Sequence, residues 1–290
     1  MTDTGNPLHA LVAPGSATPA IGASNALTAR LIEDLGFGAV YVTGAGVANT
    51  YLGVPDIGLV SLTELAEHVR AITESVSLPV IVDADTGFGN ALGVRRTVRM
   101  LERAGAAAIQ IEDQESPKRC GHFDGQTVIS RSEMVQKIRA AVDTRAGDLL
   151  LIARTDAINA VGFDDAIERA HAYREAGADV VFVEGPADRA QLETVPGLLP
   201  GVPLVANLVE GGRTPIVDRA ELARMGYGIA LFANVALQAS LHGMREALTL
   251  LRDTGDMSRV RDVVLPWAER QRLVGKPEFD EAERRYAAGR

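Results

Sequence analysis

The chain has 290 residues, 47% of them apolar, and it carries a formal net charge of −9 with a pI near 5.1. An acidic surface repels phosphate backbones, so we expect no nucleic-acid partner. One cysteine cannot form an internal disulfide, which fits a reducing compartment. We find neither a signal-peptide pattern nor an apolar run of the roughly 18 residues that span a bilayer. We therefore expect a cytoplasmic protein without a membrane partner.

Eight short apolar runs, each ending in polar or small residues, recur along the chain. Four of them follow a glycine that comes just after a helical pattern, at Gly36, Gly105, Gly177 and Gly226. A glycine there fits a helix that ends in the left-handed conformation, and the run after it fits a buried parallel strand. The eight runs lie at residues 17–23, 34–44, 78–85, 103–113, 149–156, 175–185, 202–209 and 224–234.

Helical patterns fill the gaps between these runs. Residues 61–73 begin with Ser61 and Glu64 at the spacing of a capping box. Residues 163–177 carry an apolar stripe at helical spacing. Strands therefore alternate with helices along the chain.

This alternation predicts one (β/α)8 barrel domain over residues 1–290, with a doubly wound sheet as the alternative. The 69 and 72 residues that separate the first three glycines each suit two βα units. Residues 256–290 lie beyond the eighth unit. We expect them to form a helical extension that packs on the barrel or on a neighbouring subunit.

The predicted strand ends carry polar and charged side chains. In such a barrel the carboxyl ends of all strands meet at one mouth, where active sites lie. Loops begin with polar residues in any protein, but carboxylates on three strand ends, together with an arginine and an asparagine, favour a functional site. In chain order the candidates are Thr43, Gly44, Ala45, Asp83, Asp85, Glu112, Arg154, Glu184, Asn207 and Glu210.

The carboxylates favour a hard metal ion. Asp83 and Asp85 are two residues apart and share one face of a strand. With Glu112 they form an all-oxygen set that suits Mg²⁺ or Mn²⁺, held partly through water. No histidine or cysteine cluster has zinc spacing. An acidic turn held by its glycines is the alternative for the segment DADTGFG.

Arg154 presents a planar donor at a strand end, which suits the carboxylate of a substrate. An internal ion pair with Asp156 or Glu184 is the structural alternative, and the two roles are compatible.

The single cysteine, Cys120, lies in a loop of roughly 18 residues between the fourth strand and the helix near Ser132, longer than the usual βα loop. Lys118, Arg119 and His122 flank it and should lower the pKa of its thiol. We predict that this loop is a lid, and that the thiol is a nucleophile or an acid that readily gives up its proton. The flanking charges and glycines argue against an inert buried cysteine.

The segments PKRCGH, DADTGFG, IEDQ, ARTDA and NLVEGGRTP together resemble the isocitrate lyase/phosphoenolpyruvate mutase superfamily. They are most similar to its group of 2-methylisocitrate lyases, 2,3-dimethylmalate lyases, oxaloacetate hydrolases and petal death protein. The resemblance runs from about residue 15 to the final segment LVGKPEFDEAERRY. It implies a (β/α)8 barrel, usually a homotetramer in which a C-terminal helix is exchanged between neighbours, with Mg²⁺ and a mobile loop that carries the cysteine.

The resemblance also implies a role for individual residues. Asp85, with Asp83 and Glu112 through water, matches the metal-binding acids. Asp56 matches a functional acid on the loop after the second strand, and Cys120 matches the general acid. The residues expected to contact the substrate are Thr43, Gly44, Ala45, Lys118, Arg119, Gly121, Arg154, Glu184, Asn207 and Glu210. His122 is a further catalytic candidate.

The implied reaction is Mg²⁺-dependent cleavage of a carbon–carbon bond in a small 2-hydroxy di- or tricarboxylic acid. Its products are a 2-oxo acid such as pyruvate and a second carboxylate. Tyr41, Asp56 or a metal-bound hydroxide are candidate bases for the substrate hydroxyl. Cys120 argues against the mutase branch, which typically has Asn-Ser in place of Cys-Gly-His.

The sequence leaves two classes of substrate open, substituted malates and 2-methylisocitrate. Gly211-Gly212 and the residues around Ala233 favour a substituted malate such as 2,3-dimethylmalate, whereas DADTGFG and IRAAVD are similar to 2-methylisocitrate lyases. Hydrolysis of oxaloacetate to oxalate and acetate is one alternative reaction. A carboxyphosphoenolpyruvate-type phosphonomutase is the other.

Overall fold

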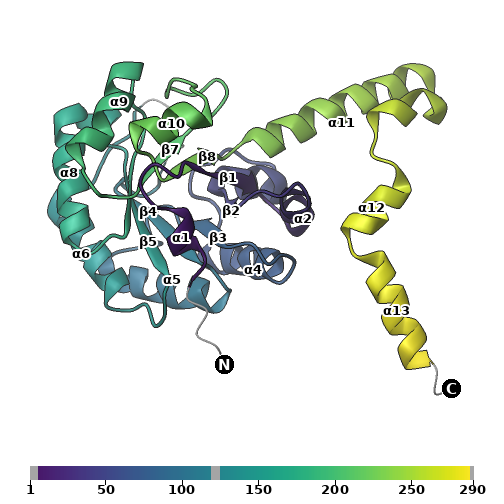
Figure 1. Cartoon of the computed structure of the whole chain (residues 1–290), viewed down its shortest axis with the longest axis horizontal. Helices are drawn as coiled ribbons and strands as arrows, with labels where there is room; N and C mark the ends of the chain where they lie inside the picture. The colour runs from purple at the N-terminus through teal and green to yellow at the C-terminus, as the bar shows by residue number, and fades with distance from the viewer. Residues whose placement is uncertain (1–5, 119–124, 288–290) are drawn as a thin grey trace.

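The computed structural model describes residues 6–118 and 125–287 of the chain. Eight parallel strands close into a barrel in sequence order, with the last strand paired to the first, and helices surround it (Figure 1). The predicted (β/α)8 barrel is confirmed. The strands are β1 (Thr18–Ala23), β2 (Ala39–Val42), β3 (Val80–Asp83), β4 (Ala108–Glu112), β5 (Leu150–Thr155), β6 (Val180–Val183), β7 (Leu204–Asn207) and β8 (Ile229–Phe232).

Helices connect the strands and extend beyond the barrel. Two short ones directly after β2, α3 and the π-helix η1, were not expected from the sequence. In chain order the helices are α1 (Leu8–Leu11), α2 (Ala26–Asp34), α3 (Gly44–Val47), η1 (Ala48–Leu52), α4 (Leu62–Thr73), α5 (Ala91–Arg103), α6 (Arg131–Val142), α7 (Ala157–Val161), α8 (Phe163–Glu175), α9 (Arg189–Leu198), α10 (Arg219–Met225), α11 (Val235–Thr254), the 3-10 helix η2 (Met257–Val263), α12 (Trp267–Leu273) and α13 (Lys276–Ala287).

Local signals in the sequence set the helix ends. At the start of α4 the backbone N–H of Glu64 donates to Ser61 Oγ at 3.3 Å, and the Ser61 N–H donates to Glu64 Oε2 at 2.8 Å, which confirms the capping box. The four glycines expected at helix ends all have positive φ angles, between 79° and 108°. These positions accept glycine because other residues are strained in that conformation.

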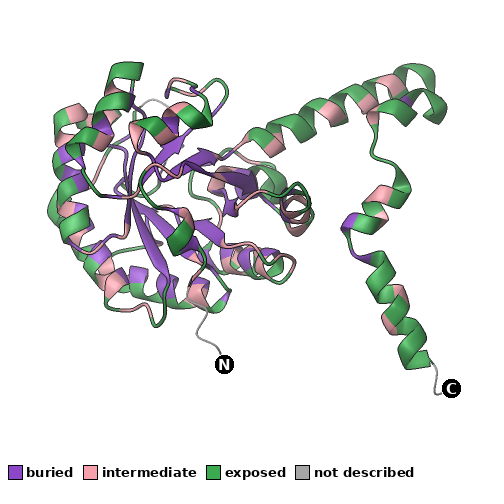
Figure 2. Ribbon diagram, viewed as in Figure 1, coloured by how far each residue is buried: buried purple, intermediate pink, exposed green. Residues whose placement is uncertain are grey.

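The core has two layers. Side chains such as Tyr41, Ile81, Phe182 and Leu231 fill the barrel interior, and branched residues on the outer faces of the strands pack under the helices. The strands are buried along almost their whole length (Figure 2). Leu8 of α1 joins the interior cluster. The barrel is therefore a packed core, and its chemistry lies at the rim.

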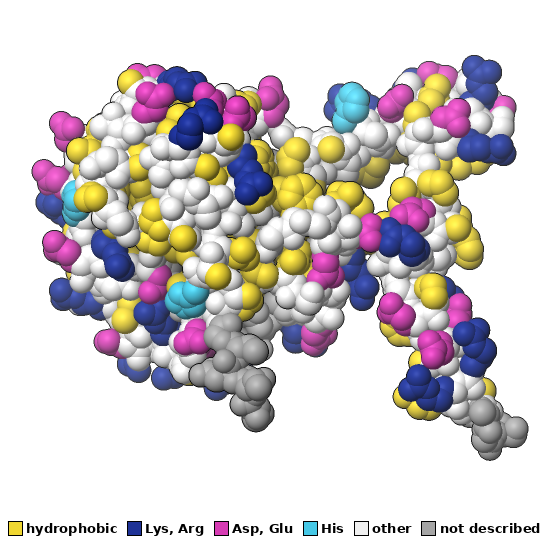
Figure 3. Space-filling view, in the orientation of Figure 1, with side chains coloured by type: hydrophobic (Ala, Val, Ile, Leu, Met, Phe, Trp, Pro, Cys, Tyr) yellow, Lys and Arg dark blue, Asp and Glu magenta, His cyan; other side chains and the backbone are white. Residues whose placement is uncertain are grey.

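The last helices form an extension that we call the C-terminal arm, residues 235–287 (Figure 1). Helix α11 has no buried residue among those described, and Leu241, Met244 and Leu248 are at least half exposed. Apolar side chains show along the arm in Figure 3. Within the described residues, no helix is both long and apolar enough to cross a membrane.

The arm returns to the barrel beside α2. Arg272 of α12 donates to both carboxylate oxygens of Asp34 on α2, at 2.7 and 2.6 Å. Both side chains are partly exposed, so this contact contributes little to stability by itself. It does show which helix of the barrel the arm lies beside.

Candidate active site

Charged and polar side chains from four consecutive strands meet at the carboxyl-terminal mouth of the barrel. Arg154 at the end of β5 lies 3.5 Å from Glu112 Oε2 of β4 and 3.9 Å from Glu184 Oε2, just after β6. Asn207 Nδ2 of β7 donates to the same Glu184 oxygen at 3.3 Å. All four side chains are buried. The structure thus brings together the strand-end residues that the sequence placed on separate segments.

Arg154 is held in one orientation. Its Nε and Nη2 donate to the two carboxylate oxygens of Asp156 at 2.9 and 2.7 Å. Its Cζ lies 5.1 Å from the centre of the Phe182 ring. Burial lowers the pKa of Arg154, but the carboxylates led by Asp156 raise it further, so the guanidinium stays charged. The internal ion pair exists and leaves Nη1 without a hydrogen bond within the described residues.

A second network behind this one fixes the position of Asp156. Asp113 Oδ1 accepts the backbone N–H of Asp156 at 2.9 Å. Its Oδ2 accepts from Tyr173 Oη at 2.6 Å, Thr155 Oγ1 at 2.8 Å and Arg169 Nη1 at 3.2 Å. Asp113 was not among the predicted site residues. The sequence did offer one signal for Asp113, namely an acidic residue at the end of an apolar run.

The acids of β3 and β4 form the other half of the mouth. Asp83 Oδ2 accepts the N–H of Gly44 at 3.3 Å, and its Oδ1 accepts from the N–H of Asp85 at 3.1 Å and from Gln110 Nε2 at 3.3 Å. Asp85 has a φ of 49°, a left-handed conformation that costs a non-glycine residue about 1–3 kcal/mol. The Glu112 N–H donates to the Asp85 carbonyl at 2.9 Å and helps to hold this turn.

Lys118 places a cation among these acids. Its Nζ lies 2.6 Å from Asp56 Oδ1 and 2.8 Å from Asp85 Oδ1, and only 4% of the side chain is exposed. Burial lowers the pKa of Lys118, but the carboxylates led by Asp85 outweigh it and raise the pKa well above the ordinary value. Burial also raises the pKa of Glu112 well above its ordinary value. The cluster therefore keeps one positive charge among several acids.

These acids fit a hydrated Mg²⁺. Glu112 Oε1 is buried and accepts no hydrogen bond within the described residues, whereas the buried Asp85 Oδ1 has the Lys118 ammonium as its partner at 2.8 Å. A cavity of about 10 Å³, room for one water, is lined by Asp56, Asp83 and Asp85. In the described part of the chain, no three acidic, histidine or cysteine side chains are arranged to hold a metal directly. Mg²⁺ keeps several waters and needs only one or two carboxylates, so this donor set suits it.

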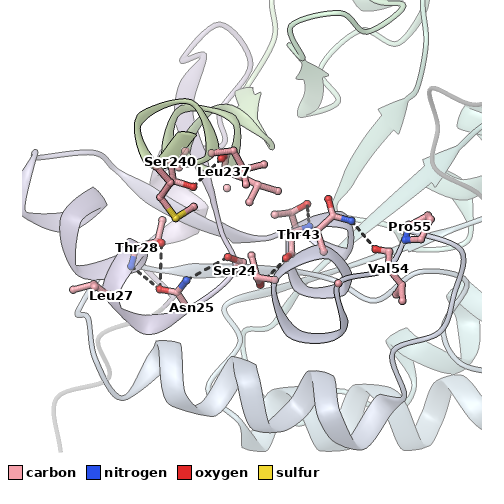
Figure 4. Close-up of a pocket in the computed structure, with 17 residues that line it drawn as sticks. Ser24, Asn25, Leu27, Thr28, Thr43, Val54, Pro55, Leu237 and Ser240 are labelled. Atoms are coloured by element: carbon pink, nitrogen blue, oxygen red, sulfur yellow. Dashed lines mark hydrogen bonds between the residues drawn. The ribbon is translucent and has the colours of Figure 1, made fainter. Parts of the chain in front are cut away.

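A larger cavity of about 880 Å³ lies between the start of α2, the α3–η1 segment and α11 (Figure 4). Its described lining is uncharged and includes Ser24, Asn25 and Thr28 beside apolar side chains such as Leu237. Thr43 lines this cavity, whereas Gly44 lines the acidic one. A multiply charged acid suits the charged mouth better than this neutral cavity.

Tyr41 is buried inside the barrel and donates from Oη to Gln110 Oε1 at 3.0 Å. Burial raises its pKa well above the ordinary value, so the phenol stays protonated. Gln110, which links Tyr41 to Asp83, was not predicted. A glutamine within an apolar strand was a signal for it, because a buried amide requires partners.

The other predicted residues are spread around the mouth. Thr43 is buried, and its Oγ1 accepts the Gly46 N–H at 3.4 Å, while Ala45 is partly exposed. Glu210 is exposed and lies outside the buried cluster. Four of the predicted site residues lie outside the described part of the chain, namely Arg119, Cys120, Gly121 and His122.

Comparison with known proteins places this chain in a family. The model of the phosphoenolpyruvate phosphomutase family matches residues 8–252. A 2,3-dimethylmalate lyase of Eubacterium barkeri is 46% identical over 93% of this chain and 93% of that protein. A 2-methylisocitrate lyase of Aeropyrum pernix is 42% identical over 94% of this chain and 85% of that protein.

Solved structures of related enzymes share the fold. Oxaloacetate acetylhydrolase in complex with the inhibitor 3,3-difluorooxalacetate has a TM-score of 0.87 and 35% identity, over 93% of this chain and 92% of that one. Phosphonopyruvate hydrolase in complex with oxalate and Mg²⁺ has a TM-score of 0.83 and 34% identity, over 94% of this chain and 95% of that one.

Proposed function

The chain belongs to the phosphoenolpyruvate phosphomutase family, and from this membership we propose that it is a Mg²⁺-dependent carbon–carbon lyase. The substrate is a 2-hydroxy di- or tricarboxylic acid similar to 2,3-dimethylmalate or 2-methylisocitrate. The products are a 2-oxo acid such as pyruvate and a second carboxylate. The observation that carries this proposal is the buried Arg154 guanidinium, held by Asp156 beside the acids of β3 and β4.

Arg154 binds a substrate carboxylate in this proposal. A guanidinium held rigidly in a buried site offers fixed donors of the geometry that a carboxylate accepts. Gly44 lines the acidic cavity of the mouth, and in this proposal the backbone of Thr43, Gly44 and Ala45 holds the carboxylate from the other side. A side chain at Gly44 would enter the acid cluster, because a Cβ there would lie 3.1 Å from Asp85 Oδ1.

Asp85 would hold the metal, with Asp83 and Glu112 acting through water. When bound there, Mg²⁺ would lower the pKa of the substrate hydroxyl and would neutralise the adjoining carboxylate. Two observations support the choice of Mg²⁺ over a softer ion. The donors are all oxygen, and a related hydrolase was solved with Mg²⁺. Mn²⁺ prefers similar ligands and is the alternative.

The reaction needs one proton removed and one delivered. A base takes the proton of the substrate hydroxyl, the carbon–carbon bond breaks, and the electron pair remains on the carbon that leaves. Asp56 is the stronger candidate base, since the Tyr41 hydroxyl donates a hydrogen bond to Gln110 and burial raises its pKa well above the ordinary value. Cys120 then delivers its thiol proton to the carbanion. No water is consumed, which distinguishes a lyase from a hydrolase.

Oxaloacetate hydrolysis is the second candidate function. The structural similarity to oxaloacetate acetylhydrolase favours it specifically. That reaction would yield oxalate and acetate without a new 2-oxo acid. The products therefore separate the two functions directly.

The remaining proposals concern the assembly and location of the protein. We treat residues 1–290 as one barrel domain whose residues 256–290 are a helical extension. The exposed Leu241, Met244 and Leu248 of α11 support a homotetramer in which neighbours exchange their C-terminal helices. The single cysteine supports a reducing, cytoplasmic location.

A lactate-dehydrogenase-coupled assay with Mg²⁺ tests the function. We expect pyruvate from 2,3-dimethylmalate or 2-methylisocitrate, and loss of the signal with EDTA or in Cys120→Ser. Oxalate is measured in parallel with oxaloacetate as the substrate. Oxalate without pyruvate would assign the hydrolase function. If no product forms from any of these acids, both the lyase and the hydrolase proposals are contradicted.

A further inference from the structure

Lys118 lies where it can act on the metal site as well as on the substrate. It is one of only three lysines in the chain, and it is 5% exposed. Its Nζ forms ion pairs with two carboxylates, Asp56 at 2.6 Å and Asp85 at 2.8 Å. Asp56 follows η1 and Asp85 follows β3, so the ammonium joins two loops of the barrel mouth.

The oxygen that meets this ammonium is also the candidate metal ligand. A Cβ at Gly44 would lie 3.1 Å from Asp85 Oδ1, 3.2 Å from Asp83 Oδ2 and 3.5 Å from Lys118 Nζ. These three charged atoms therefore surround one point. The cavity beside them measures only about 10 Å³. It has room for one water and not for a hydrated divalent cation next to the ammonium.

Electrostatics gives the same answer as the geometry. An ammonium and a divalent cation a few ångströms apart repel each other strongly in a buried site, where solvent screens little. Either cation alone would compensate the charge on Asp85. Asp56 is a second partner of the Lys118 ammonium, and the ammonium can keep this ion pair when its contact with Asp85 is broken.

We propose that Lys118 is an exchangeable counter-ion of the metal site. In the metal-free protein its ammonium neutralises Asp85, and on metal binding it is displaced from Asp85 and stays with Asp56. The proposal rests on the proposed function for the identity of the metal. Lysine suits such an exchange because its point charge is carried on a flexible four-carbon stem, whereas a bidentate arginine is bound to one geometry.

Calorimetric titration of the metal-free protein with Mg²⁺, and with Mn²⁺, tests the exchange without turnover. At pH 8, Lys118→Met removes the competing cation, so we expect the Kd for Mg²⁺ to fall at least about tenfold, which corresponds to 1.4 kcal/mol. Lys276→Met is the matched control, since it also removes a Lys–Asp ion pair but lies on the exposed α13. Its Kd should equal that of the unmodified protein.

A double-mutant cycle separates exchange from the general effect of charge. Asp56→Asn removes the partner to which the ammonium retreats, so in the otherwise unmodified protein it should raise the Kd for Mg²⁺ about fivefold or more. In the Lys118→Met background no ammonium needs a partner, and the same change should have a clearly smaller effect. Equal effects in both backgrounds would mean that Asp56 acts only through its own charge, which overturns the proposal.

Thermal unfolding provides a second readout. Lys118→Met should lower the Tm of the metal-free protein more than that of the Mg²⁺-saturated protein, because only the former uses the ammonium. Lys118→Gln replaces it if the methionine variant does not fold. A Kd for Mg²⁺ that is unchanged or higher in these variants, or no Mg²⁺ or Mn²⁺ binding by the unmodified protein, overturns the proposal. Intact binding without turnover would count only against the proposed function.

Discussion

Asp156 holds the guanidinium of Arg154 from two residues further along the chain, with donor–acceptor distances of 2.9 and 2.7 Å. Asp156 is itself fully buried and anchored through its backbone N–H to Asp113 at 2.9 Å. The arginine is therefore oriented before any substrate arrives. Such preorganisation lowers the cost of ordering the site on binding.

The first prediction concerns this pair. Asp156→Asn keeps the shape but removes the charge that holds both guanidinium donors, so Arg154 should lose its fixed orientation. A hydrogen bond to a charged group contributes about 1.5–3 kcal/mol, so kcat/KM should fall about 10–100-fold, mainly through KM. Steady-state kinetics with the identified acid measures this. Arg154→Lys should lose at least as much, and an Asp156→Asn enzyme with normal KM would contradict the role.

The second prediction concerns stability. Asp113 accepts four hydrogen bonds, one of them from the buried Arg169. Asp113→Asn replaces one acceptor oxygen by a donor and leaves Arg169 with less compensation. Breaking a buried ion pair typically costs 3–5 kcal/mol, and we expect about 3 kcal/mol in urea unfolding. Glu115→Gln, an exposed neighbour, should change stability by less than about 0.5 kcal/mol.

The third prediction concerns pH. Burial raises the pKa of Glu184 above its ordinary value of 4.5. A carboxyl whose pKa is raised on folding favours the folded state fully below its unfolded pKa, and this contribution is lost as the pH rises through the folded pKa. From about pH 4.5 upward, the contribution of Glu184 to the stability of the metal-free protein should therefore decline.

Glu184→Gln should make this decline shallower, because the glutamine cannot ionise. Urea unfolding of both proteins between pH 5 and pH 8 measures the two slopes. Glu193→Gln, an exposed residue of α9, serves as the control. Parallel slopes for the Glu184→Gln and unmodified proteins would refute the assignment.

The fourth prediction distinguishes the candidate bases. Tyr41→Phe removes one hydrogen bond to Gln110, which contributes about 1 kcal/mol, so kcat should fall by less than about tenfold. Asp56→Asn removes the carboxylate that we assign as the base, and a loss of about 100-fold or more is expected. The pH profiles of kcat/KM for both variants complete the test. The reverse ranking would make Tyr41 the base.

Much of the fold could be read from the sequence because its signals are local. Glycine at Gly105 or Gly177 marks a helix end through a backbone conformation that other residues avoid. Ser61 and Glu64 mark a helix start through two hydrogen bonds within one turn. Eight such units leave few ways to bury eight apolar strands, and the closed barrel is one of them.

The candidate site was accessible by the same reasoning, since parallel strands of a barrel all end at one mouth. That rule was sufficient to bring Asp83, Glu112 and Arg154 together. Gln110 and Asp113 were missed, because their roles depend on partners 27 to 69 residues away in the chain. Helices α3 and η1 were missed because they occupy the segment after β2 where a loop is expected: α3 begins after the single residue Thr43, and η1 follows α3 directly.

The sequence by itself determined the barrel, the order of its strands and which residue types would line its mouth, because periodicity and capping act within a few residues. Only the tertiary structure decided which charges pair. The Lys118 ammonium could have faced water, a substrate or any of several acids, and packing placed it between Asp56 and Asp85. Pairing of buried charges depends on distances of a few ångströms between distant segments, and those distances exist only once the barrel has closed.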